Sequence, residues 1–148
     1  MAETLGMLCD KLTIVKLKQF HTQDTEKLNS LGQQALYLQQ EIDQYIADAI
    51  SGLIAPEKLT FAANKIFKEK GNKTRDFSGE IGDVIAQLAD INCRLWHEQE
   101  KVYDFENVQI SEKDNVVKQL AILNLERNKC IDLINHQFRK ILLMENKG

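Results

Sequence analysis

Residues 111–145 read SEKDNVVKQLAILNLERNKCIDLINHQFRKILLME, and their apolar side chains recur every three or four positions. In a helix of about 100° per residue, this spacing gathers the apolar side chains on one arc. A long amphipathic helix of this kind buries its apolar arc against other helices. The arc comprises Val116, Leu120, Leu123, Ile131, Ile134, Phe138 and Ile141.

Four polar side chains interrupt this arc, at Asn124, Arg127, Asn128 and Asn135. Burying the guanidinium of Arg127 without a partner would cost several kcal/mol or more. We therefore expect Arg127 to have an acidic or otherwise oriented partner. The sequence predicts a polar group inside the core of a helical protein.

The rest of the chain also predicts helices, because it holds one proline, seven glycines and no strand pattern. Asp24 is a good N-cap, and Pro56 suits the first residue of a short helix. Ser111 with Asp114 resembles a capping box, and residues 68–75 form the one clear linker. The expected helices span about residues 3–20, 24–51, 56–68, 78–105 and 111–145.

These elements predict an all-α fold, an antiparallel helical bundle of four long helices plus one short helix. The chain of 148 residues fits a single helical-bundle domain, 1–148. The segment from Leu28 to Ala49 carries unbroken heptads, which also permit a dimeric coiled coil. A homo-oligomer is therefore left open.

The composition excludes several classes of protein. A net charge of −3 provides no basic field for nucleic acid. No stretch approaches the roughly 18 apolar residues that cross a bilayer, so we expect no membrane insertion. The first ten residues lack the features of a signal peptide, and Cys9, Cys93 and Cys130 form no C-x-x-C pair. We expect a protein of a reducing compartment, the cytoplasm.

Polar side chains also fall on the apolar faces of two other predicted helices. Asn92 and Gln99 lie within the apolar stripe of the helix over residues 78–105. Asp10 and Lys16 lie close to the apolar side chains of the first helix. Three helices thus each place amide or charged groups on faces that should be dry, and Asp10 or a neighbouring acid could neutralise the buried arginine.

This polar group allows three interpretations. It is a hydrogen-bond network that fixes helix register, as one core Asn does in coiled coils. It is alternatively a pocket for an anionic or polyhydroxylated small molecule, with Arg127 and Lys16 as charge donors. In a third interpretation, Arg127 faces outward and meets a partner chain. Four interior polar positions on one helix exceed what register requires, which favours the pocket.

Two patterns are compatible with a metal site. Cys93, His97 and Glu100 share one helix face, as do Asp132 and His136, and i, i+4 spacing can hold a metal ion. Such residues are more often a solvated face. We expect no metal and no cofactor.

Glu80 and Asp83 resemble half of the carboxylate motif of MazG-type nucleoside triphosphate pyrophosphohydrolases. Those all-helical enzymes hold magnesium with E-x-x-E on one helix and E-x-x-D on the next. The preceding helix here offers Glu41 and Asp43, which are two positions apart, so the first half is missing. Glu80 and Asp83 also suit the N-terminal dipole of a helix. A magnesium-dependent pyrophosphohydrolase is the less favoured alternative.

Three motifs occur in order: D-K-L-T-I from Asp10, I-N-C-R-L-W-H-E from Ile91, and N-L-E-R-N from Asn124. Together they resemble bacterial all-helical families known only as domains of unknown function, whose members often accompany surface-polysaccharide or lipopolysaccharide genes. The resemblance implies a shared polar centre and a link to surface-polysaccharide metabolism, but no activity. Its motif positions are Asp10, Lys16, Asn92, Trp96, Glu98, Asn124 and Arg127.

The function that these patterns favour is binding of a small anionic or sugar-type ligand. The alternative is a non-enzymatic interaction or oligomerisation protein whose polar core only sets helix register. Neither pattern decides whether the protein is an enzyme. The candidate ligand-binding residues are Arg127, Asn124, Asn128, Asn92, Lys16, Asp10, Gln99, Trp96 and Glu98.

Overall fold

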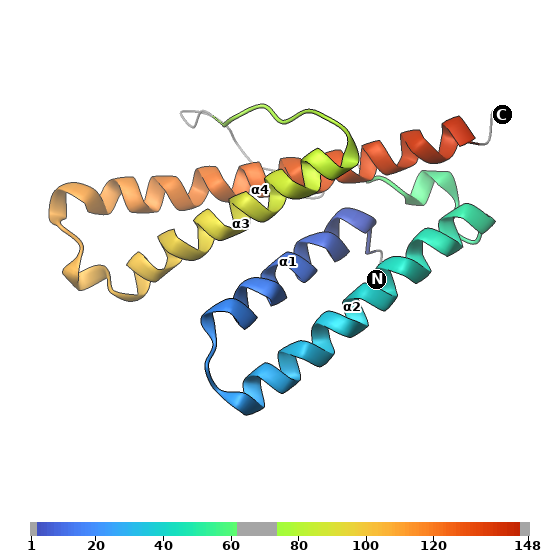
Figure 1. Cartoon of the computed structure of the whole chain (residues 1–148). Coiled ribbons are helices and arrows are strands. Elements are labelled where there is room, and N and C mark those ends of the chain that lie inside the picture. The colour runs from blue at the N-terminus through green and yellow to red at the C-terminus, as the bar shows by residue number, and fades with distance from the viewer. Residues whose placement is uncertain (1–2, 62–73, 146–148) are drawn as a thin grey trace.

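The computed structural model describes residues 3–61 and 74–145, and within these ranges the protein is all-helical, as predicted. Four long helices are described, and short turns join the first to the second and the third to the fourth (Figure 1). None of the described helices combines the length and apolar character needed to cross a membrane. The elements are α1 (Leu5–His21), α2 (Thr25–Ser51), the 3₁₀ turn η1 (Pro56–Lys58), α3 (Ile81–Tyr103), the 3₁₀ turn η2 (Phe105–Asn107) and α4 (Ile110–Glu145).

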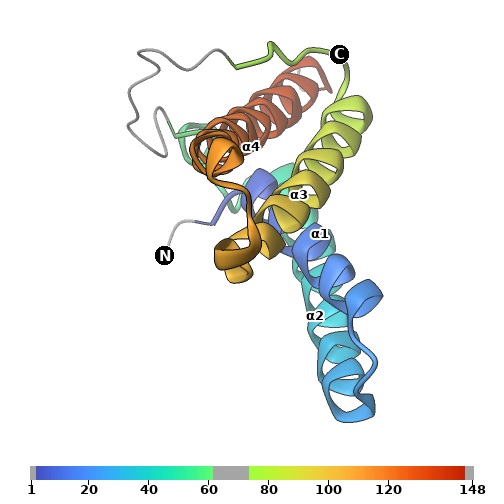
Figure 2. The ribbon, with the colours of Figure 1, turned by 90° about the vertical axis from the view of Figure 1, so that its left-hand side faces the viewer.

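The helices form two antiparallel hairpins, α1–α2 and α3–α4, in accord with the predicted antiparallel bundle. Helix α1 joins the hairpins, because it packs on α2 and also on both α3 and α4. Helix α2 packs mainly on α1. Figure 2 shows the turn of the α1–α2 hairpin pointing away from the α3–α4 hairpin. The two hairpins therefore separate toward their outer ends.

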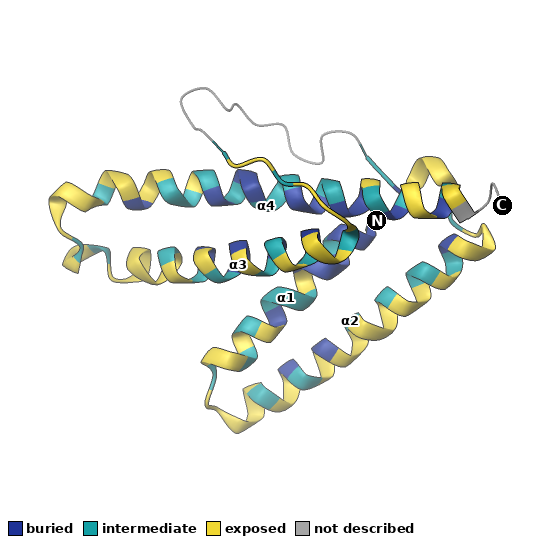
Figure 3. Ribbon diagram, turned by 45° about the horizontal axis from the view of Figure 1, so that its top comes forward, coloured by how far each residue is buried: buried dark blue, intermediate teal, exposed yellow. Residues whose placement is uncertain are grey.

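The buried apolar side chains form two clusters, and Figure 3 shows the buried residues in dark blue. The larger lies where the start of α1 crosses α3 and α4, and its fully buried members include Val84, Leu88, Ile91 and Ile134. The smaller cluster holds the outer half of α1 against α2. It contains only three buried side chains, Val15, Leu31 and Ala35.

The heptad stripe of α2 is occupied within the chain. Leu31 and Ala35 are buried against α1, and Ala49 belongs to the larger core. The aromatic ring of Tyr45 lies 6.0 Å from that of Phe138 on α4. A partner helix is thus not needed to cover this stripe, which weakens the sequence argument for a coiled-coil dimer.

Helix α1 approaches α4 very closely at Gly6. The backbone N–H of Gly6 donates to Oδ1 of Asn135 at 2.7 Å. A Cβ atom on Gly6 would lie 2.3 Å from the carbonyl oxygen of Ile131, so any larger residue would push the helices apart. Asn135 therefore satisfies one of the unpaired N–H groups at the start of a helix and fixes this crossing.

Helix boundaries follow the predicted caps in part. Oδ1 of Asp24 accepts from the N–H groups of Glu26 and Lys27 at 2.9 and 3.1 Å, so the predicted N-cap is confirmed. The capping box predicted at Ser111 is wrong, because α4 already begins at Ile110. The exact first residue of a helix is the least certain part of a sequence prediction, because a helix can begin one or two residues earlier or later.

The predicted short helix over residues 56–68 falls largely outside the described residues. Its described part is the single 3₁₀ turn Pro56–Lys58, followed by the buried Leu59. The predicted linker is described only at Thr74 and Arg75, which both bond to α4.

Candidate functional site

A buried carboxylate connects three helices. Asp10 on α1 is 4% exposed and accepts two hydrogen bonds from Arg127 on α4, from Nε at 2.9 Å and from Nη2 at 2.5 Å. Asn92 on α3 donates from Nδ2 to Asp10 at 2.9 Å and to the hydroxyl of Thr13 at 2.8 Å. The expected pairing of Asp10 with Arg127 is therefore present, and it has the bidentate form that gives such pairs their fixed geometry.

This network matches positive with negative charge. The hydrogen bonds that Arg127 donates to Asp10 raise the pKa of Arg127 above its usual value, an effect that burial partly opposes. The guanidinium thus stays protonated, and its charge is compensated by a carboxylate inside the core. The Asp10 side chain is 5% exposed and that of Arg127 is 33% exposed, so loss of the arginine would leave a buried carboxylate without its charge partner.

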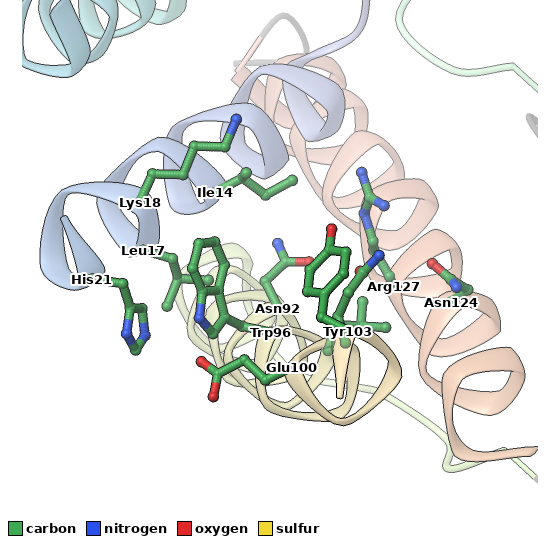
Figure 4. Close-up of a pocket in the computed structure, with 12 residues that line it drawn as sticks. Ile14, Leu17, Lys18, His21, Asn92, Trp96, Glu100, Tyr103, Asn124 and Arg127 are labelled. Carbon is green, nitrogen blue, oxygen red and sulfur yellow. The ribbon is translucent and has the colours of Figure 1, made fainter. Parts of the chain in front are cut away.

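Beside the network lies an open cleft of about 590 Å³, between the outer half of α1 and the α3–α4 hairpin (Figure 4). Its volume falls within the roughly 300–1,000 Å³ of small-molecule sites. Helix α1 contributes Ile14, Leu17, Lys18 and His21; α3 contributes Asn92, Leu95, Trp96, Gln99, Glu100 and Tyr103; α4 contributes Asn124 and Arg127.

One wall of the cleft is aromatic. The imidazole of His21 stacks on the indole of Trp96, with ring centroids 4.7 Å apart and planes within 9°. Tyr103 lies two turns further along α3 and is 83% exposed at the rim. No sequence pattern predicts the contact between His21 and Trp96, because His21 follows the predicted end of a helix and no periodicity links the two positions.

The structure brings five of the nine candidate residues to the cleft lining. Asp10 lies behind them as the buried partner of the network. The five that line the cleft are Asn92, Trp96, Gln99, Asn124 and Arg127.

Three candidates lie elsewhere. Lys16 is exposed and does not line the cleft, and Asn128 donates to the backbone carbonyl of Asn124 at 2.9 Å. Glu98 accepts from Lys101 at 3.0 Å and lines a separate groove. Helical geometry explains two of these placements. Lys16 follows Asp10 by six positions and Glu98 follows Asn92 by six, which turns each side chain about 120° away.

A second buried carboxylate was missed by the sequence analysis. Glu126 is 3% exposed and accepts from the backbone N–H of Arg75 at 3.1 Å. Arg75 also donates from Nε at 3.0 Å and from Nη2 at 3.2 Å, and these bonds raise the pKa of Arg75. The pair ties the segment before α3 onto α4. No local pattern could reveal it, because Arg75 lies in the predicted linker.

Glu80 and Asp83, the two carboxylates of the partial magnesium motif, have a structural role, and the cysteines Cys9 and Cys130 are buried. Oδ2 of Asp83 accepts from the N–H of Glu80 at 3.2 Å and so closes the start of α3. Burial raises the pKa of the Cys9 and Cys130 thiols to about 11. Among the residues that the structure describes, no three His, Cys, Asp or Glu side chains are placed to hold a metal ion.

Comparisons with known proteins give no relative: no family model, curated protein or solved structure matches the chain. The resemblance to families near surface-polysaccharide genes therefore stays a prediction. The function has to be argued from the cleft itself.

Proposed function

We propose that the protein binds a small anionic or sugar-type molecule in the cleft between α1, α3 and α4. The observation that carries this proposal is an open cavity of about 590 Å³ that borders the buried polar network. Small-molecule sites combine apolar and aromatic walls with a few placed polar groups, and this cleft has both. A role in surface-polysaccharide metabolism is part of the proposal and rests only on the family resemblance.

Helix register alone does not account for the cleft. The bonds among Asp10, Asn92 and Arg127 suffice to align the three helices. Gln99 and Tyr103 take no part in these bonds, yet they share the cleft-facing side of α3 with Trp96. A purely structural role would favour side chains that fill this space, because protein interiors are close-packed.

Thermal unfolding with a ligand panel tests the proposal. The panel contains sugars, sugar phosphates, nucleotide sugars and inorganic phosphate. A ligand at a hundredfold excess over its Kd adds about 2.7 kcal/mol to the native state. For a chain of this size that raises the unfolding midpoint by about 5–10 °C.

Two variants with matched controls locate the binding. Tyr103→Ala and Gln99→Ala alter exposed positions in the cleft, so both should fold and lose most of the ligand-induced shift. Tyr37→Ala and Gln40→Ala make the same changes on exposed positions of α2 and should keep it. A shift that survives in both cleft variants, or no shift with any ligand, would overturn the proposal.

The alternative function, protein interaction, has one observation in its favour. Helix α2 exposes the large apolar side chains of Leu36, Tyr37 and Ile50. These three side chains do not form one continuous stripe, and the heptad face is already packed. Light scattering at micromolar concentration tests self-association. A strictly monomeric protein would rule out a homo-oligomer.

A further inference from the structure

The positive charge of Arg127 is balanced by the carboxylate of Asp10, so a ligand meets no net positive charge at this pair. Two of its three guanidinium nitrogens donate to Asp10, which is buried and held by Asn92 as well. An anion approaching Arg127 would meet a fixed carboxylate bonded to the same guanidinium. Only Nη1 makes no hydrogen bond to a residue that the structure describes, so Arg127 offers the cleft a neutral donor edge rather than a cation.

The two asparagines of the cleft, Asn92 and Asn124, already donate hydrogen bonds within the protein. Nδ2 of Asn92 donates to both Asp10 and Thr13, which uses both of its hydrogens. Nδ2 of Asn124 donates to the carbonyl of Leu120 at 3.0 Å. Figure 4 shows the amide oxygens of Asn92 and Asn124 turned toward the space between them. Both residues therefore present acceptors to a ligand.

The remaining charged groups also disfavour an anion. Glu100 is the one acid among the cleft-lining residues, and it lies on the same side of α3 as Trp96 and Tyr103. Lys18 is exposed, and Figure 4 shows its side chain extending along α1 away from Trp96 and Glu100. Although Lys18 belongs to the lining, its side chain points away from Glu100, so a phosphate or carboxylate placed beside Trp96 and Tyr103 would meet the carboxylate of Glu100.

Resting on the proposed binding function, we infer that the ligand is a hydroxyl-rich ring without negative charge, an unphosphorylated sugar unit. Hydroxyl groups both donate and accept, so they can satisfy Asn92, Asn124 and Glu100 and also accept from Nη1 of Arg127. The apolar face of a sugar ring suits the wall formed by Trp96 and Tyr103. Phosphate oxygens only accept, and they would leave the cleft acceptors unpaired.

Calorimetric titration of matched probe pairs tests this inference. The probes are glucose, galactose and mannose, each beside its 6-phosphate, at about 50 and 500 mM salt. We expect at least one neutral sugar to bind about tenfold or more tightly than its phosphate. Its affinity should change little with salt, because no ion pair forms between ligand and protein.

The variant Glu100→Gln removes one negative charge at nearly constant shape. It should narrow the gap between a sugar and its phosphate by several-fold, because repulsion of the phosphate is reduced. Glu106→Gln is the matched control, an exposed glutamate in η2 outside the cleft. The control should leave the gap unchanged.

The outcomes separate this inference from the proposed function. Tighter binding of the phosphates, weakened by salt, would overturn the neutral ligand while upholding a binding cleft. If the protein prefers the neutral sugars and Glu100→Gln does not change this preference, the role given to Glu100 is wrong. Absence of binding by every probe at millimolar concentration would overturn the neutral sugar ligand, while the wider thermal-unfolding panel would still decide the proposed binding function.

Discussion

The two halves of helix α1 are held in very different ways. Its first half is locked by a backbone contact at Gly6 and by the bonds of Asp10 to two other helices. Its second half has the small cluster around Val15 on one side and the stack of His21 on Trp96 on the other. The cleft opens where the tight contacts end.

This difference separates structural polar groups from groups that can bind a ligand. At the inner end, the buried polar side chains find partners in the chain and align the helices. At the outer end, Gln99, Glu100 and Tyr103 face an open space and keep hydrogen-bonding capacity. On α4, Asn135 and Arg127 bond to the first half of α1, whereas Asn124 lines the cleft.

The largest effect is expected from breaking the inner network. Arg127→Leu leaves the Asp10 carboxylate buried without its charge partner, and losses of about 3–5 kcal/mol are typical of such changes. Urea unfolding of the variant should show a loss in this range. The double variant Asp10→Leu with Arg127→Leu should recover part of the free energy of unfolding, because no buried charge is left.

A loss below about 1 kcal/mol in Arg127→Leu would contradict this account, since it would show that water compensates Asp10 without the arginine. The same instability makes Arg127→Leu a poor test of ligand binding. The exposed cleft residues give a cleaner test.

The second effect concerns the close crossing of α1 and α4. Gly6→Ala places a Cβ atom only 2.3 Å from the carbonyl oxygen of Ile131, and overpacking of this kind costs about 1–3 kcal/mol or more. Gly82→Ala is the matched control, because nothing lies within 4 Å of its added Cβ. Because alanine is favoured over glycine in a helix, Gly82→Ala should raise the free energy of unfolding by about 0.5–1 kcal/mol.

Equal effects of the two glycine variants on urea unfolding would contradict the close contact of the helices. A lower free energy of unfolding in Gly6→Ala together with a higher one in Gly82→Ala would establish that glycine is needed at position 6 for packing and not for backbone freedom. The comparison needs no ligand, so it tests the inner half of α1 alone.

The sequence predicted what depends on periodicity within one helix. The apolar arc of α4 followed from helical spacing, except at Ile141, which is 44% exposed. The interior position of Arg127 followed from the same spacing, and its need for a partner led to Asp10. The depth of the cleft did not follow, because it depends on the angle at which the α1–α2 hairpin leaves the α3–α4 hairpin. That angle is set by Gly6 and Asn135, which no pattern in either helix relates to one another.

The same limit explains the residues that were misplaced. Lys16 was included because it was placed close to the apolar side chains of the first helix, and Glu98 because it stands in a motif of a resembled family. Helical geometry turns both side chains away from the polar network. Glu126 and Arg75 were missed because their pairing joins a helix to a segment with no periodic pattern. Contacts between segments distant in sequence leave no local signal in a single chain.

The smallest effect is expected at the outer end, from His21→Ala. Removal of the stacked imidazole should cost only about 0.5–1.5 kcal/mol, because aromatic pairs contribute in this range and His21 is exposed. Hydrogen exchange should then rise in the outer half of α1, after Val15, while amides near Asp10 keep their protection. Gln23→Ala, in the exposed turn before α2, is the control and should change neither region. If exchange near Asp10 rose equally, the two halves of α1 would open as one unit, and the cleft wall could not adjust to a ligand without disturbing the core.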